Sequence, residues 1–223
     1  MIKYYPVPIT EHDTLLGPDF SANFAAEMKE YYAPFIKKGR KIQLAKETWE
    51  YGVADSIPDA DWLGSGNNVV DVKAPLLDMD VKGLSCSKLG KETTEASFLQ
   101  NLAKGADGYS TAWANRDWAT LKTIFVDPLE TKHLGTNNLH LMVIVRTKND
   151  HGVYYGLLKA EPNPLDQAQF LSEMTQHAGR SVRIPMIDEE FGRTYICISK
   201  RRLEIRINTE GFGPYLQFSH YSK

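Results

Sequence analysis

With 223 residues, the chain is long enough for one domain of ordinary size. A hydrophobic fraction of 42% allows a real buried core, and a net charge of −2 gives no global support to nucleic-acid binding without excluding it. Any contact with a phosphate backbone must therefore depend on a local cluster of charge. No apolar run approaches the ~18 residues of a membrane span. The first residues show no secretory pattern, and Cys86 and Cys197 suit reduced thiols, so we expect a cytoplasmic protein without a membrane partner.

The first half of the chain contains one clear helix and one strand pair. Apolar side chains recur at three- and four-residue spacing over residues 21–38, which predicts a helix that Pro34 kinks or ends. Two short apolar runs, 69–72 and 76–81, flank a turn that contains Pro75 and predict a hairpin within about residues 68–83. Further patterns predict a short strand at 42–44 and helices at 93–104 and 112–121.

The second half is rich in strand patterns. The apolar run 139–145 predicts a buried strand, which pairs with 153–158 across a hairpin-like loop. A helix is expected at 165–177, followed by strands at 194–199 and 202–208. This mixture predicts an α/β or α+β fold in which helices flank one central mixed β-sheet, with residues 1–223 forming a single domain.

The predicted hairpin carries the residues with the clearest chemistry. Asp80 and Lys82 lie two positions apart on one strand, so their side chains point to the same face. The turn can bring Asp71 of the first strand alongside them. Both aspartates stand inside apolar runs, and a buried carboxylate needs a partner or a metal ion. The alternative interpretation, without a functional role, is a charged hairpin edge whose exposed ion pairs contribute little to folding stability.

These residue types suit the hydrolysis of a phosphodiester bond. Mg²⁺ prefers carboxylate oxygens and retained waters, and two aspartates can hold it. The ion then polarises the phosphoryl oxygen and lowers the pKa of a bound water. A lysine ammonium can orient that water and stabilise charge in the transition state. The small, polar and basic segment that follows, residues 83–88, suits a position against a phosphate backbone.

The segment 67–71, followed by Met79-Asp80-Val81-Lys82-Gly83, resembles the signature of the PD-(D/E)xK nuclease superfamily, in the style of type II restriction endonucleases. The resemblance is confined to these two short segments. It implies a restriction-endonuclease-like fold in which Asp71, Asp80 and Lys82 are catalytic. Asp71 and Asp80 are then the Mg²⁺ ligands and Lys82 is the catalytic lysine. The family often adds an acid on an early helix, and Glu27 fits that position.

A second register of the same pattern remains open. Asp71-Val72-Lys73 is itself an acid-x-lysine triplet, and Asp59 lies upstream of it, which gives the set Asp59, Asp71 and Lys73. We prefer the later register because Lys82 precedes the small polar segment and then a predicted helix, an order the family often shows. Asp78 shares a face with Asp80 and could also enter the site.

Other segments offer candidates for contact with DNA. Arg183, Lys200 and Arg202 are of the type that binds phosphates, although a solvated basic turn that protects a sheet edge explains them as well. Asn115 and Arg116 are of the types that read adenine and guanine, but the aromatic segment around them also suits the packing of a helix into the core.

These expectations combine into a homodimeric, Mg²⁺-dependent endodeoxyribonuclease that cuts double-stranded DNA at a specific site. Two-fold symmetric proteins suit palindromic sites, and each protomer would cut one strand. Two alternatives remain: a non-catalytic DNA- or protein-binding module whose acid-x-lysine triplets are coincidental, and a repair or phage nuclease of the same fold.

Overall fold

The protein is an α+β structure with helices at the sides of a mixed central sheet, which confirms the expected class. The computed structural model describes residues 2–64, 70–90, 93–98, 108–136, 138–162, 168–169, 171–172, 181–185, 195–199 and 203–223. Its larger sheet has seven strands in the order β1-β7-β6-β4-β3-β2, with β11 also paired to β7. A second sheet, which was not predicted from the sequence, has four strands in the order β5-β10-β9-β8.

The described helices and strands follow one another in groups along the chain. The first half contains β1 (Ile2–Pro6), α1 (Ile9–Leu16), α2 (Phe20–Lys37), α3 (Lys46–Asp55), β2 (Asp61–Trp62), β3 (Val72–Lys73), β4 (Asp78–Cys86) and β5 (Thr93–Phe98). The helices α5 (Tyr109–Asn115), α6 (Trp118–Leu121), the π-helix η1 (Lys122–Val126) and α7 (Asp127–Leu134) follow. The rest comprises β6 (Leu139–Thr147), β7 (Gly152–Pro162), β8 (Ser181–Pro185), β9 (Tyr195–Ser199), β10 (Leu203–Asn208), α9 (Thr209–Phe212), the 3₁₀ helix η3 (Gly213–Tyr215) and β11 (Gln217–Tyr221). Among the described helices, none combines the length and apolarity that a membrane crossing requires.

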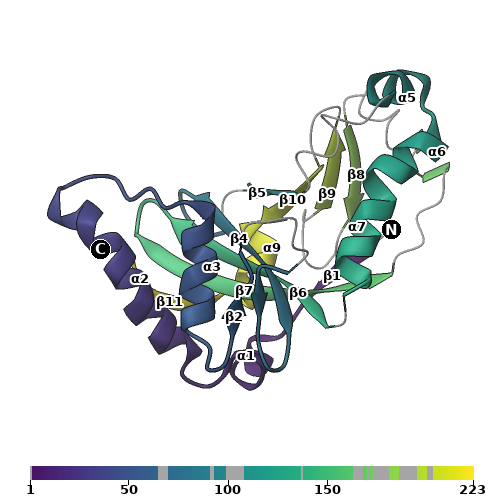
Figure 1. Cartoon of the computed structure of the whole chain (residues 1–223). Helices are drawn as coiled ribbons and strands as arrows, with labels where there is room; N and C mark the ends of the chain where they lie inside the picture. Colours follow the sequence, from purple (N-terminus) through teal and green to yellow (C-terminus); the bar gives the residue numbers. More distant parts are fainter. Residues whose placement is uncertain are drawn as a thin grey trace.

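The two faces of the large sheet pack against different helices. Along β4, Met79 and Val81 point into a core formed with α1, α2 and α3. Leu84 and Cys86 point into a second core, which includes residues of α5, α6 and α9. Figure 1 shows α2 and α3 side by side over the large sheet, with α5, α6 and α7 gathered near the smaller sheet. Because successive side chains of a strand alternate between faces, Asp80 and Lys82 share the face of Leu84 and Cys86.

The strands around the site follow the predicted patterns. β6 is buried along nearly its whole length and pairs with β7 as an antiparallel hairpin, as expected. β3 and β4 are antiparallel, with Val72 opposite Met79, which confirms the predicted strand pair. β4 is parallel to β6, with Asp80 opposite Leu141, so the strand that carries Asp80 and Lys82 is held in the interior of the sheet. The first predicted helix is α2, which continues past Pro34 to Lys37.

Other segments depart from the prediction for identifiable reasons. Residues 93–98 form strand β5 and not a helix, because β10 offers a partner along the whole segment, from Thr93 opposite Asn208 to Phe98 opposite Leu203. Residues 42–44 form no strand. The helix expected at 112–121 is divided, since Arg116 adopts a positive φ of 55° and Asp117 caps α6 by accepting a hydrogen bond from Thr120 N at 3.2 Å.

The end of the chain was predicted in part. The expected strands at 194–199 and 202–208 correspond to β9 and β10, which are antiparallel neighbours, although they belong to the smaller sheet. The helix expected at 165–177 lies largely outside the described residues, and positions 168–169 and 171–172 are helical.

A glycine fixes the distance between α3 and β4. A Cβ atom placed on Gly83 would lie 2.5 Å from Cδ1 and 2.6 Å from Nε1 of Trp49, whose ring is buried. The Gly83→Ala variant should therefore push α3 away from the sheet and lower the free energy of unfolding by about 1–3 kcal/mol in a denaturant titration. An unchanged free energy of unfolding in Gly83→Ala would show that α3 does not need this close approach.

Candidate functional site

The structure brings Asp71, Asp80 and Lys82 together at the place where β3 begins beside β4. Their exposed fractions are 5%, 0% and 7%, so all three are buried. The Nζ atom of Lys82 donates a hydrogen bond to Oδ1 of Asp80 and lies 3.6 Å from Oδ2 of Asp71. The preferred register of the acid-x-lysine pattern is therefore the one whose side chains meet in space.

The backbone of β4 helps to hold Asp71. Asp71 lies just before β3, and its backbone N–H donates to Met79 O at 2.8 Å. Val81 N, two positions further along β4, donates to Oδ2 of Asp71 at 2.8 Å. The Asp71 carboxylate thus accepts a hydrogen bond from a backbone amide of β4, next to the last residue pair that joins β3 to β4. This bond fixes the carboxylate against β4, close to Asp80.

Helix α7 contributes a second lysine. The Nζ atom of Lys132 lies 2.9 Å from Oδ2 of Asp80, and the Lys132 side chain is only 14% exposed. Since Lys82 contacts Oδ1, each oxygen of Asp80 has its own ammonium partner. His133, the next residue of α7, places Nε2 at 3.8 Å from Oδ2 of Asp80.

Helix α3 contributes an acid and a third lysine. Lys46 lies 2.7 Å from Oε1 of Glu50, one turn along the same helix, and 3.6 Å from Oδ1 of Asp71. Glu50 is fully buried, and its Oε2 accepts a hydrogen bond from Trp62 Nε1 at 3.1 Å. We call this set the acid–lysine cluster: Lys46, Glu50, Asp71, Asp80, Lys82 and Lys132.

The two aspartates have opposite protonation behaviour. Burial would raise the pKa of Asp80, but the ammonium groups of Lys82 and Lys132 outweigh burial and hold this pKa well below its usual range. Burial raises the pKa of Asp71 to about 6, and the adjacent Asp80 carboxyl adds to this rise. Both carboxyl groups lie beside the same Lys82 ammonium group. The pair therefore concentrates negative charge in a buried place, where a cation stabilises it.

His133 is a neutral neighbour of the cluster. Its burial lowers the pKa of the imidazole to about 3, although the Asp80 carboxylate acts in the opposite direction. The ring meets Tyr4 edge to face, with 5.5 Å between the centroids. At neutral pH the imidazole carries no charge, so Lys82 and Lys132 are the cations that neutralise Asp80.

Asp71 and Asp80 both lie beside Lys82 and supply hard carboxylate oxygens, the type of donor that Mg²⁺ prefers. Within the described residues, no group of three or more His, Cys, Asp or Glu side chains is arranged to hold a metal ion. An ion held by Asp71 and Asp80 would therefore complete its coordination with water and substrate oxygens, as Mg²⁺ commonly does.

The other residues of the predicted site lie elsewhere. Glu27 is half-buried on α2. Burial is the main cause of the raised pKa of Tyr31, and the charges of Asp55 and Glu27 add to it. Among the described residues, Glu50 and not Glu27 is the helical acid linked to the cluster. Asp59 and Lys73 are exposed, and no described ion pair joins either of them to Asp71. Asp78 begins β4 and is half-buried.

The structure describes only some of the residues that were expected to contact DNA. Lys200, Arg202 and the side chain of Arg183 lie outside the described residues. Asn115 and Arg116 are exposed at the end of α5, whereas Trp113 of the same helix is buried in the core. Trp113 therefore packs into the core, and Asn115 and Arg116 face solvent.

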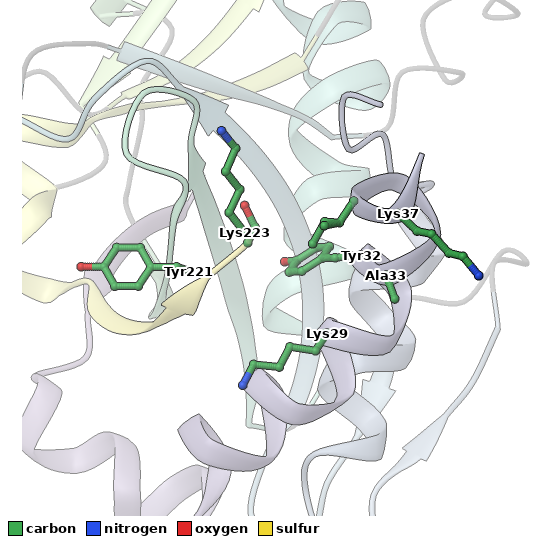
Figure 2. A pocket seen from close by; sticks show the side chains of 8 residues that line it. Lys29, Tyr32, Ala33, Lys37, Tyr221 and Lys223 are labelled. Atoms are coloured by element: carbon green, nitrogen blue, oxygen red, sulfur yellow. The ribbon is translucent and has the colours of Figure 1, made fainter. Parts of the chain in front are cut away.

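A separate cavity of about 390 Å³ lies between α2 and the end of the chain. Figure 2 shows Tyr32 on α2 facing Lys223 across this cavity, with Lys29 and Lys37 on the same helix. Among the described residues that line it, the titratable side chains are those of lysine and tyrosine, and none of them belongs to the acid–lysine cluster.

Sequence reasoning missed the three members of the cluster that α3 and α7 supply. A signal for α3 was present, because Trp49 and Val53 are spaced by one helical turn and Lys46 stands one turn before Glu50. Lys132 had no such signal, since its ion pair with Asp80 spans 52 residues.

Comparisons of the chain with protein-family models, curated proteins and solved structures find no match.

Proposed function

We propose that this protein is a Mg²⁺-dependent endonuclease that hydrolyses phosphodiester bonds of double-stranded DNA. The observation that carries the proposal is the buried Asp71–Asp80 carboxyl pair with the Lys82 ammonium in contact with it. Buried acids with a lysine between them suit a reaction in which a cation, a water molecule and a phosphate must meet. The resemblance to the PD-(D/E)xK signature supports the same reading.

The site residues have different roles in the proposed reaction. Asp71 and Asp80 would hold the ion, which when bound polarises the phosphoryl oxygen and lowers the pKa of a coordinated water. Lys82 contacts Asp80 and lies 3.6 Å from Asp71, so its ammonium can donate a hydrogen bond to a water held beside both carboxylates. The same charge stabilises the additional negative charge of the transition state.

The rigidity of β4 supports this role for Lys82. The strand pairs with β6 from Asp78 to Cys86, and the Lys82 side chain is only 9% exposed. A lysine held in this way loses little freedom when it engages the reacting groups, so its charge is already in place before DNA arrives. Glu50, through Lys46, steadies the Asp71 carboxylate from the α3 side.

The restriction-type activity belongs to the same proposal. We expect a homodimer in which each protomer cuts one strand of a palindromic site, because a two-fold axis in the protein matches one in the DNA. Lys46, Lys82 and Lys132 lie at the proposed cleavage site, but the carboxylates of Glu50, Asp71 and Asp80 balance their charges, so other basic side chains would have to contact the DNA backbone.

Incubation with plasmid DNA, with Mg²⁺ or with a chelator, tests the proposal. Discrete fragments that appear only with Mg²⁺ would support site-specific cleavage, and a smear would support a nonspecific nuclease of the same chemistry. DNA that stays intact under every condition, together with no heat of Mg²⁺ binding in calorimetry, would overturn the proposal. The acid–lysine cluster would then be an ion-pair network that stabilises a binding module.

A further inference from the structure

Lys132 occupies a position that the proposed function alone does not explain. It comes from α7, far along the chain from the hairpin, yet its Nζ lies 2.9 Å from Oδ2 of Asp80. Lys82 already neutralises the other oxygen of Asp80. The carboxylate expected to bind a metal ion therefore has both of its oxygens covered by ammonium groups.

The charges of the cluster balance without a metal ion. In their ordinary ionised forms, the carboxylates of Glu50, Asp71 and Asp80 are matched by the ammonium groups of Lys46, Lys82 and Lys132. A divalent cation added to this balanced set leaves two excess positive charges in a mostly buried place. Such an excess is unfavourable unless an ammonium group moves away or an anion arrives.

Of the two lysines on Asp80, Lys132 is the one placed to move. Lys82 also lies 3.6 Å from Asp71 and is 9% exposed, so it keeps a second partner in the cluster when a cation takes its place on Asp80. Lys132 is 14% exposed, and its one described ion pair is with Asp80. Its flexible four-carbon stem can carry the charge a few ångströms to a neighbouring anion.

We infer that Lys132 is a phosphate-binding residue of this site, held on Asp80 until a divalent cation displaces it toward the scissile phosphate. The inference rests on the proposed function and adds a regulatory consequence to it. A phosphodiester brings the negative charge that the metal-loaded cluster lacks. Metal and DNA therefore bind cooperatively, and each raises the affinity for the other by the same factor.

Calorimetry with Ca²⁺, with and without plasmid DNA, measures this coupling without requiring activity. For the unmodified protein we expect DNA to raise the affinity for Ca²⁺ by about 5–150-fold, the usual range of coupling between sites. Lys132→Gln should bind Ca²⁺ more tightly than the unmodified protein when DNA is absent, and should lose most of the coupling. Lys132→Arg keeps the charge on Asp80 and should retain it.

The salt dependence of DNA binding gives a second readout that a structural role would not change. With Ca²⁺ present, the slope of log K against log salt should become shallower by about 0.9 in Lys132→Gln, because one phosphate contact is lost. Without a divalent cation, the slope should equal that of the unmodified protein, since Lys132 then remains on Asp80.

Lys122→Gln is the matched control. It removes a lysine that precedes α7, pairs with Asp127 and is 46% exposed, so it should behave as the unmodified protein in both measurements. Unchanged coupling in a Lys132→Gln protein that cleaves DNA would overturn this inference alone. Absence of both cleavage and Ca²⁺ binding in the unmodified protein would overturn the proposed function together with it.

Discussion

Replacement of Lys82 by methionine should lower the rate of DNA cleavage by about 10²–10³-fold, because the reaction loses a positioned hydrogen-bond donor and positive charge. Methionine keeps the length and apolar stem of the side chain, and Asp80 retains Lys132 as a partner. DNA binding should therefore persist while the chemical step fails. The measurement is single-turnover cleavage of plasmid DNA at saturating Mg²⁺.

Lys73→Met is the matched control for this experiment, since Lys73 belongs to the competing acid-x-lysine triplet and is exposed. It should cleave DNA as the unmodified protein does. The opposite pattern, in which only the Lys73 variant loses cleavage, would move the site to the register of Asp59, Asp71 and Lys73.

Asp80→Asn should have the largest combined effect on stability and activity. Removal of the charge leaves Lys82 and Lys132 without their shared carboxylate in a buried place, which typically costs about 3–5 kcal/mol. For a chain of this size, each kcal/mol lowers Tm by roughly 2–4 °C. Mg²⁺-dependent cleavage should also disappear, because one of the two oxygen donors for the ion loses its charge.

Two further variants separate these effects. Asp78→Asn removes a half-buried carboxylate from the first position of β4 and should change Tm little, whereas Asp80→Asn should change it strongly. The double variant Asp80→Leu, Lys82→Met should recover part of the lost stability, since a buried ion pair can be replaced by apolar groups. It should not recover cleavage. An Asp80→Asn protein with unchanged Tm and full cleavage would remove Asp80 from the site.

The local part of the site was predictable from the sequence. The alternation of apolar residues around Asp80 and Lys82 places both on one face of a strand, and the turn before Asp78 returns Asp71 to them. These relations depend on neighbours within about one hairpin, for which strand periodicity is sufficient information.

The remainder of the site depends on how distant segments pack. Lys132 meets Asp80 because α7 comes to lie close to it, and no periodicity in residues 127–134 indicates this partner. Glu50 was missed because no helix was predicted between the expected strand at 42–44 and the hairpin at about 68–83, although Trp49 packs close to Gly83 of β4. Likewise, β5 became a strand through its partner β10, against the local pattern.

The parallel register of β4 and β6 also determines the order in which the site assembles during folding. The β3–β4 hairpin closes a short loop and can form in about 1–10 μs, and it carries Asp71, Asp80 and Lys82. Pairing of β4 with β6 must close a much longer loop, so it comes later, and α7 lies within that loop. The early hairpin holds the acids Asp71, Asp78 and Asp80 and the lysines Lys73 and Lys82, so one negative charge is uncompensated. The site therefore attracts cations more strongly before α7 packs against it than in the folded protein. Packing of α7 brings Lys132 to Asp80 and neutralises the excess negative charge.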